Sequence, residues 1–322
     1  MSPRHVLLAT LVAAIWGFNF VVIEIGLDSF PPLLFVALRF LVAAFPAVLF
    51  VRRPPVPWRW LLAIGVPMGA GQFGLLFIGM HLGMPAGLTS VVLQTQVLFT
   101  ILFAGLLLRE RLTRAQSIGV LLAFGGVILI GVDFGQTSPV GAFVLCLGGA
   151  ANWGLANVGM RRVNQIDAAP RERGAGEQAG ENVGIDAFAF MVWLSLVPPV
   201  PLFALSLIFE GPRADLHALT HFSLSGLGAL AYIAYLATLV GFGIWGWLMR
   251  RYDAGVVAMY SLLVPPFGLA SAALVRAERI SVLHLLATAF IVGGVALGNL
   301  HWRGRSRTGA AASPEPQPVP SR

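Results

Sequence analysis

Few polar side chains interrupt the apolar runs of this chain, and they are the residues that could do chemistry. Glu24 and Arg39 are the charged residues that we place inside such runs. A charge at a membrane helix centre costs about 2.5–3.5 kcal/mol even on insertion-based scales, so each one needs a partner or a function. Arg39 is suited to bind a substrate carboxylate, and Glu24 to bind an amino group or a proton. The structural alternative is an ion pair between Glu24 and Arg39, which would lock their two runs together.

Uncharged polar and aromatic residues recur in several other runs. A lone amide in a membrane helix is usually explained by one interhelical hydrogen bond, of about 0.6 kcal/mol. The set as a whole instead predicts the lining of a water-accessible cavity for a small zwitterion, because amides and aromatic rings occur in both halves of the chain. We also expect Tyr235, Thr238, Phe242 and Trp245 to share one helical stripe. The predicted substrate-binding residues are Trp16, Asn19, Arg39, Gln72, Gln94, Gln96, Asn157, Tyr235, Trp245 and Ser261.

The motifs that mark common enzymes are absent from the sequence. It holds no nucleophile elbow, phosphate-binding loop or HExxH motif, and Cys146 is the only cysteine. We therefore expect no catalytic residue, no metal site and no cofactor. A membrane enzyme would need clustered His, Asp or Glu at one membrane face, and a sensor would need a folded output module; the sequence provides neither.

The composition is that of an all-α membrane protein. Of 322 residues, 57% are hydrophobic and 11% are charged, whereas soluble domains average roughly 25% charged residues. Apolar runs of about 20 residues, each long enough to cross a bilayer, fill most of the chain. They do not alternate in polarity as the strands of a β-barrel would. We predict ten transmembrane helices at about 6–26, 33–51, 60–81, 86–108, 115–132, 139–160, 187–208, 224–249, 254–275 and 282–300.

The distribution of arginine predicts the orientation. All 21 basic residues are arginines. With the N-terminus in the cytoplasm, 17 of them fall in inner segments and 3 in outer segments. This positive-inside bias places both termini in the cytoplasm. It also accounts for the high pI of about 10.9, so we expect a lipid bilayer and a small molecule as partners, and no nucleic acid. Nothing in the sequence indicates an oligomeric state.

One stretch of the chain recurs. Residues 86–129 correspond without a gap to residues 254–297, 168 positions later. We therefore divide the chain into two five-helix repeats, residues 6–132 and 139–300. Five is an odd number, so the repeats have inverted topology, which is typical of secondary transporters with a midplane substrate site. The paired markers are Ala86 and Gly87 with Ala254 and Gly255, Glu110 and Arg111 with Glu278 and Arg279, and Gly125 and Gly126 with Gly293 and Gly294. A second similarity, upstream of this stretch, pairs Trp16 and Gly17 with Trp153 and Gly154.

Three segments interrupt this regular pattern. Residues 161–186 are rich in Gly, Glu, Arg and Ala, and we expect a flexible cytoplasmic loop there. Residues 304–322 are rich in Pro, Ser and Ala, and we expect a disordered cytoplasmic tail. Pro265 and Pro266 remove two backbone donors from the ninth span, so they should break or kink that helix.

The motifs also resemble those of the EamA family, which belongs to the drug/metabolite transporter superfamily. The resemblance covers about residues 5–302 and rests on residues 15–19 (Ile-Trp-Gly-Phe-Asn), 38–40 (Leu-Arg-Phe), Gly87, 110–112 (Glu-Arg-Leu) and 125–126. It implies a ten-helix exporter. Residues 83–88, 92–96, 241–246 and 261–265 more narrowly resemble family members that export O-acetylserine and cysteine from bacteria.

We therefore expect an inner-membrane exporter of small amino-acid metabolites, O-acetylserine and cysteine first, working by alternating access between inverted repeats. No ATP-binding motif is present, so export would be gradient-driven or facilitated. The main alternative is a broader exporter of sugars, aromatic amino acids or cationic toxicants. A cationic drug needs a carboxylate within the membrane, for which Glu24 is the candidate. A non-transporting sensor or a membrane enzyme is the remaining alternative.

Overall fold

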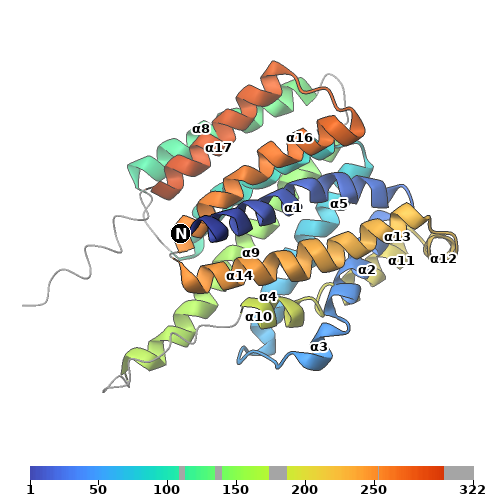
Figure 1. The fold of residues 1–322 in the computed structure, drawn as a ribbon, viewed down its shortest axis with the longest axis horizontal. Helices are drawn as coiled ribbons and strands as arrows, with labels where there is room; N and C mark the ends of the chain where they lie inside the picture. The colour runs from blue at the N-terminus through green and yellow to red at the C-terminus, as the bar shows by residue number, and fades with distance from the viewer. Residues whose placement is uncertain (109–112, 135–139, 174–186, 253, 301–322) are drawn as a thin grey trace, which may run out of the picture.

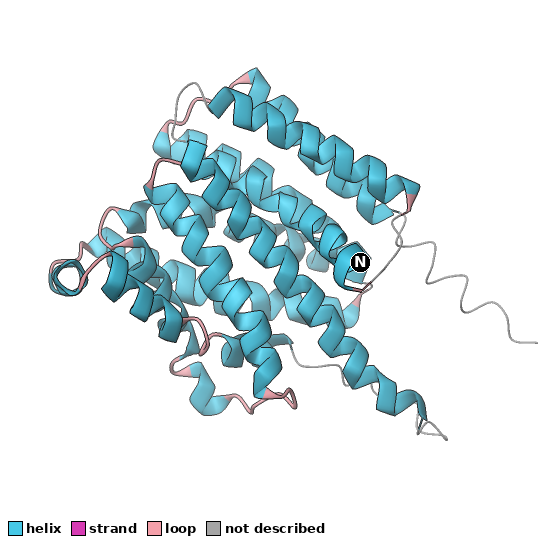
Figure 2. Cartoon of the chain, turned by 180° about the vertical axis from the view of Figure 1, so that it is seen from behind, coloured by secondary structure: helices cyan, strands magenta, loops and turns pink. Residues whose placement is uncertain are grey.

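The computed structural model describes residues 1–108, 113–134, 140–173, 187–252 and 254–300, and every regular element in these ranges is a helix (Figures 1 and 2). Their bounds are α1 Pro3–Leu27, α2 Pro32–Ala44, α3 Ala47–Phe50, α4 Trp58–Gly65, η1 Val66–Phe73, α5 Gly74–His81, α6 Ala86–Val92, η2 Leu93–Thr95, α7 Gln96–Leu107, α8 Arg114–Phe134, α9 Val140–Arg173, α10 Ala187–Leu194, α11 Pro199–Phe209, α12 Pro212–Thr220, α13 Leu224–Ala231, η3 Tyr232–Val240, α14 Gly241–Arg251, α15 Ala254–Ala258, η4 Met259–Leu263, α16 Val264–Arg276 and α17 Val282–Leu300.

Nine helices within these ranges are long and apolar enough to cross a membrane. They run over Pro3–Leu27, Pro32–Phe50, Trp58–His81, Ala86–Leu107, Arg114–Gly131, Val140–Val163, Phe188–Phe209, Leu224–Arg251 and Val256–Arg276. Their ends lie within a few residues of the predicted spans. The tenth predicted span corresponds to a shorter apolar helix, Val282–Leu297.

α1 lies at the centre of the bundle, between α16 on one side and the α13–α14 line on the other, and α8 and α17 form a pair at one edge (Figure 1). Glycines allow the closest of these approaches. A Cβ on Gly17 of α1 would lie 2.5 Å from Cβ of Phe267, and one on Gly126 of α8 would lie 2.7 Å from the carbonyl oxygen of Ala287. Side chains at these positions would therefore force the helix pairs apart.

Similar contacts between a glycine and a phenylalanine occur twice in the chain. Gly154 of α9 packs on Phe99 of α7, and Gly17 of α1 packs on Phe267 of α16; Phe99 and Phe267 are 168 positions apart. In each pair, a helix of one half lies against a helix of the other half. The chain therefore repeats contacts as well as sequence.

Irregular turns interrupt four of the long helices. Two are π-helical, η1 and η3, and two are 3₁₀, η2 and η4. η4 ends at Leu263, directly before Val264, Pro265 and Pro266 begin α16. The expected break in the ninth span is thus present, and its cause is that neither proline has an N–H to continue the preceding turn. π-helical turns are frequent at functional sites, and each of the four turns carries a polar residue that the sequence singled out.

The segment after Met160 differs from the prediction. We expected residues 161–186 to be a loop, whereas α9 continues as a helix to Arg173. Ala168 and Ala169 favour a helix there. The preceding part of α9 is already helical, and adding residues to an existing helix costs less free energy than starting a new one. Residues 174–186, and the predicted tail 304–322, lie outside the described residues.

Candidate functional site

Arg39 is the central feature of the candidate site. It projects from α2 and is 3% exposed. Its Nη2 donates a 3.2 Å hydrogen bond to Oγ1 of Thr238 in η3. Its guanidinium carbon lies 3.9 Å from the ring centroid of Phe73 and 5.4 Å from that of Phe40. Nε and Nη1 have no hydrogen-bond partner. The guanidinium is therefore held by ring faces and one neutral hydroxyl, with donors to spare.

Trp16 and Trp245, two of the predicted site residues, lie in contact. Their ring centroids lie 5.0 Å apart, and Phe242 lies 5.1 Å from Trp16. The indole Nε1 of Trp16 donates a 2.9 Å hydrogen bond to the carbonyl oxygen of Ala237. That carbonyl is in η3, where a π-helical turn changes the ordinary backbone pairing. α1 is thus joined to η3 one residue from the Arg39 partner.

Two amide contacts bring together four more of the predicted residues. Nε2 of Gln94 donates a 3.0 Å hydrogen bond to the carbonyl oxygen of Ser261. Nδ2 of Asn157 donates to Oε1 of Gln96 at 2.7 Å and to Oγ1 of Thr100 at 3.1 Å. These contacts link η2 to η4 and α7 to α9. These amides therefore form interhelical hydrogen bonds, which is the usual explanation for an amide in a membrane helix.

Asn19 and Gln72 are the amides with capacity left over. They are 7% and 1% exposed, and Oδ1 of Asn19 and Oε1 of Gln72 have no hydrogen-bond partner. Gln72 directly precedes Phe73, the residue that stacks on Arg39. Buried polar atoms are normally paired, so unpaired ones call for an explanation such as a ligand.

Tyr235 does not share a buried stripe with its predicted companions. It is 44% exposed, whereas Thr238 is 1% exposed. The reason is the π-helical turn of η3, in which Oγ1 of Thr238 reaches back five residues to the carbonyl oxygen of Ile233. The extra residue per turn rotates Tyr235 away from the face that ordinary helical spacing predicts.

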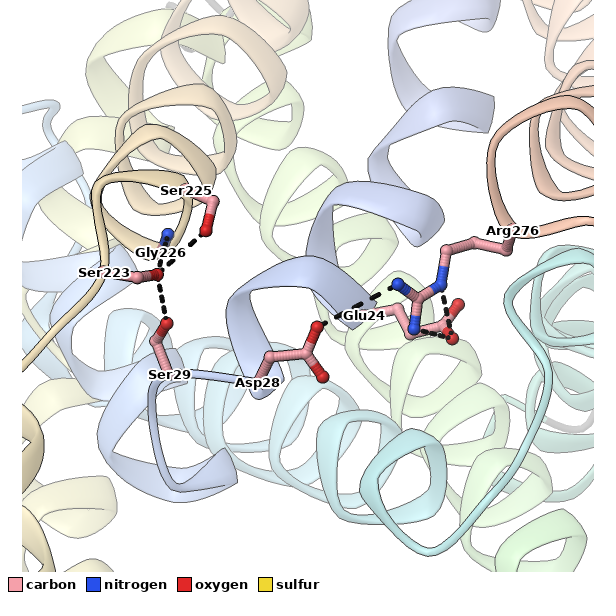
Figure 3. Close-up of polar contacts among 7 residues, drawn as sticks. All are labelled: Glu24, Asp28, Ser29, Ser223, Ser225, Gly226 and Arg276. Carbon is pink, nitrogen blue, oxygen red and sulfur yellow. Dashed lines mark hydrogen bonds and ion pairs between the residues drawn. The ribbon is translucent and has the colours of Figure 1, made fainter.

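Of the two alternatives for Glu24 and Arg39, the ion pair between them is not formed. Oε1 of Glu24 instead lies 2.7 Å from Nη2 of Arg276, and Arg276 also approaches Asp28 at 3.9 Å (Figure 3). Glu24 is near the end of α1, its side chain 27% exposed, where α16 also ends. Arg276 therefore reaches Glu24 from the other half of the chain, while Arg39 stays buried with Thr238.

Further contacts between the halves surround this ion pair. We call this the Glu24 end of the bundle, made up of Glu24, Asp28, Ser29, Glu210, Ser223, Arg276 and Glu278. Oγ of Ser29 lies 2.6 Å from Oγ of Ser223, which also caps α13 at Gly226 (Figure 3). At this end, then, hydroxyl and charged contacts both join the halves.

Two glutamates cap helices of the other half at the Glu24 end. The Glu278 carboxylate accepts hydrogen bonds from the backbone N–H groups of Ala86 at 2.8 Å and Gly87 at 3.1 Å. The Glu210 carboxylate accepts from those of Leu33 at 2.7 Å and Leu34 at 3.1 Å. Carboxylates are favoured at helix N-termini by the free N–H groups and the helix dipole. Burial raises the pKa of Glu278, and the hydrogen bonds from Gly87 and Ala86 offset part of that effect.

Aromatic contacts join the halves at the opposite end. The ring of His5 lies 5.0 Å from that of Trp247 and 5.5 Å from that of Tyr252. Trp193 donates a 3.0 Å hydrogen bond from Nε1 to the carbonyl oxygen of Val51. Both ends of the bundle are thus bridged by side chains in the state described.

Sequence reasoning missed Arg276, Glu278 and Glu210 as contact residues. The sequence predicts only that Arg276 is one of the three arginines in outer segments and that Glu278 is a marker of the repeat. The recurrence of Glu110 as Glu278 could have indicated the capping role of Glu278, because a carboxylate in the turn between two helices is suited to cap a helix N-terminus. Glu110, its counterpart in the first half, lies outside the described residues.

The arrangement suits binding and conformational change. Within the described ranges no cluster of His, Cys, Asp and Glu is placed to hold a metal ion. A buried guanidinium with spare donors, in a bundle that also holds unpaired amide oxygens, is equipped to bind a small polar molecule.

Known proteins resemble this chain over nearly its whole length. Residues 4–132 and 177–300 match the model of the EamA-like transporter family. A "Probable amino-acid metabolite efflux pump" of Escherichia coli (strain K12) is 38% identical over 314 residues, covering 96% of this chain and all of the relative. A "Probable terminal-alkyne amino-acid exporter" of Streptantibioticus cattleyicolor is 24% identical, covering 92% of this chain and 94% of the relative.

A solved structure described only as "Crystal structure of protein" shares the fold. It superposes with a TM-score of 0.58 at 20% identity, covering 92% of this chain and 97% of that one. The membrane-length helices and the bacterial relatives make this a multi-pass protein of the bacterial inner membrane. It is not an enzyme, because the family and the relatives are transporters. The match of both halves, together with the relative aligned along its entire length, leads to one assignment: the chain belongs to the EamA-like transporter family.

Proposed function

We propose that this transporter exports small amino-acid metabolites, O-acetylserine and cysteine first, by alternating access of a central site between two inverted five-helix repeats. The relatives support amino-acid metabolites as the substrate class, since one is named as an efflux pump for them and another as an amino-acid exporter. O-acetylserine and cysteine are small zwitterions, and the core amides and Arg39 suit their polarity.

The observation that carries this proposal is that polar contacts of the predicted site residues cross from one half to the other. Arg39 contacts Thr238, Trp16 contacts Ala237, Gln94 contacts Ser261, and Gln96 contacts Asn157. A substrate bound among these residues would touch both halves. Its binding would then favour particular arrangements of the halves, as alternating access demands.

The contacts at the two ends support the ten-span topology with cytoplasmic termini. The inter-half contacts at the Glu24 end join outer segments or the adjoining ends of spans in the arginine-based topology, as with Ser29 and Ser223 or Ala86 and Glu278. His5 and Tyr252 meet at the other end, which the same distribution places inside. On this proposal the Glu24 end is the outer gate, and it is closed in this conformation.

Counterflow in liposomes that hold the purified protein tests the substrate assignment. Labelled cysteine or O-acetylserine is followed, while unlabelled sugars, aromatic amino acids and cationic dyes compete, with and without a pH gradient. We expect only cysteine and O-acetylserine to compete strongly. Dominant competition by another class would refute the substrate assignment, and dependence on the pH gradient would identify proton coupling.

A further inference from the structure

Arg39 is a buried cation without an anion. Among the described residues, Glu24 pairs with Arg276 and Glu210 caps α2, so neither carboxylate neutralises Arg39. Its Nε and Nη1 have no partner, although the side chain is only 3% exposed. A buried charge without a counter-ion is strongly unfavourable. Such a charge within a membrane protein indicates a function, and the simplest function is to bind the anionic group of a ligand.

The surroundings of Arg39 hold the guanidinium but do not satisfy it. The guanidinium carbon lies 3.9 Å from the centroid of the Phe73 ring, and the N–H donors point outward in the guanidinium plane. Oγ1 of Thr238 accepts one hydrogen bond from Nη2, and its own hydrogen goes to the carbonyl oxygen of Ile233 at 2.7 Å. Nη2 has a second hydrogen, which lies beside either Nε or Nη1 and forms a donor fork with it.

A planar fork of two parallel N–H donors is complementary to a carboxylate. Among the described residues, the other buried side-chain polar atoms without a hydrogen-bond partner are all acceptors: Oδ1 of Asn19, Oε1 of Gln72 and Oε2 of Glu24. Acceptors suit an ammonium group and offer nothing to an anion. A donor fork together with separate acceptors matches the two charged groups of an α-amino acid.

We propose that Arg39 binds the carboxylate of the transported amino acid, so that the protein selects zwitterionic or anionic substrates and rejects amines that lack a carboxylate. This proposal rests on the proposed function and specifies how its substrate is recognised. Phe73 and Thr238 are positioning residues, since they orient the guanidinium without being required to touch the substrate.

The test compares ligands that differ by one group. Unlabelled cysteine, cysteamine (which lacks the carboxylate) and 3-mercaptopropionate (which lacks the amine) compete against labelled cysteine in counterflow by the wild-type protein. We expect cysteamine to compete on the order of 100-fold less well than cysteine, because the fork then has no anion to bind. Equal competition by cysteine and cysteamine would overturn the proposal, and this measurement needs no variant that might misfold.

Variants of Arg39 then assign the discrimination to this residue. In Arg39→Gln we expect the preference for cysteine over cysteamine to fall to near unity. In Arg39→Lys we expect partial retention, about 10-fold, since lysine keeps the charge but not the fork. Arg59→Gln is the matched control, because Arg59 is exposed in α4 and should leave the preference intact. An unchanged preference in Arg39→Gln would overturn the proposal.

The two proposals fail in different ways. If the wild-type protein moves neither cysteine nor O-acetylserine, the substrate assignment fails. If it moves them and cysteamine competes equally well, the substrate assignment stands and only the role of Arg39 is lost.

Discussion

Glu24 of α1 and Arg276 of α16 form an ion pair of 2.7 Å that ties the first half of the chain to the second. The pair is at the end of the bundle and partly exposed, with Asp28 3.9 Å from the same guanidinium. An exposed ion pair contributes only about 0.2–1 kcal/mol. Such a pair can bias a conformational equilibrium without locking it, as the proposed outer gate requires.

Glu24→Gln should therefore loosen the Glu24 end without abolishing transport. We expect about a 1.4- to 5-fold faster reaction of Ser29→Cys with a membrane-impermeant maleimide, in a Cys146→Ala background. Asp28→Asn is the matched control and should change the rate less, because Asp28 is farther from Arg276 and 67% exposed. Loss of cation export in Glu24→Gln would instead favour the broader exporter, with Glu24 as its cation site.

A disulfide between cysteines placed at Ser29 and Ser223 should stop transport. Ser29 and Ser223 bring their hydroxyl oxygens to 2.6 Å, so cysteines at both positions can form a disulfide of about 2.05 Å with small adjustments. In Ser29→Cys/Ser223→Cys with Cys146→Ala, we expect oxidation to abolish counterflow and reduction to restore it.

Ser29→Cys/Ser225→Cys is the control for that experiment, since Ser225 contacts Ser223 rather than Ser29. Full activity of the oxidised Ser29/Ser223 variant would mean that the halves need not separate at this end.

Asn19→Leu and Gln96→Leu should separate binding from stability. Oδ1 of Asn19 has no partner, so its removal should leave the thermal unfolding midpoint unchanged while KM for cysteine rises about 2- to 10-fold. Gln96→Leu removes the acceptor of the 2.7 Å bond from Asn157 and should cost about 1–3 kcal/mol of stability. Wild-type transport by both variants, at normal expression, would remove Asn19 and Gln96 from the site.

Gly17→Ala should destabilise the α1–α16 contact. The new methyl would lie 2.5 Å from Cβ of Phe267 and 2.8 Å from the backbone nitrogen of Gly268. Overpacking of this kind costs about 1–3 kcal/mol, to be measured by thermal unfolding in detergent. Gly125→Ala is the control, because a Cβ there would meet no atom within 4 Å. Equal unfolding midpoints for the two variants would contradict the close packing.

Glu278 should make stability depend on pH. Burial raises its pKa above the value in the unfolded chain, so the folded state binds a proton more readily. Its contribution is most favourable at pH below the unfolded pKa and is lost as pH rises through the raised folded pKa. The unfolding midpoint of wild type relative to Glu278→Gln should therefore increase on acidification. A difference that grows toward neutral pH would mean that the caps on Ala86 and Gly87 outweigh burial.

The membrane-length helices could be predicted from the sequence because bilayer thickness and hydropathy set them locally. Run length and the prolines at the breaks placed nine spans within a few residues of Pro3–Leu27 through Val256–Arg276. The same local information led to the expected break before Pro265. It also identified Arg39 and the amides as unusual, because each is costly in an apolar run whatever surrounds it.

Tertiary structure decided which side chains meet. Glu24 and Arg39 are close in sequence and have opposite charges, yet Glu24 pairs with Arg276, 252 positions away, and Arg39 contacts Thr238, 199 positions away. The π-helical turn of η3 likewise separated Tyr235 from Thr238. Such outcomes depend on how the two halves dock and on one extra residue per turn, and neither is encoded in the spacing of a single helix. The sequence alone determined the helices and the polar residues that are unfavourable within them. The packing of one half against the other decided which partners those polar residues have.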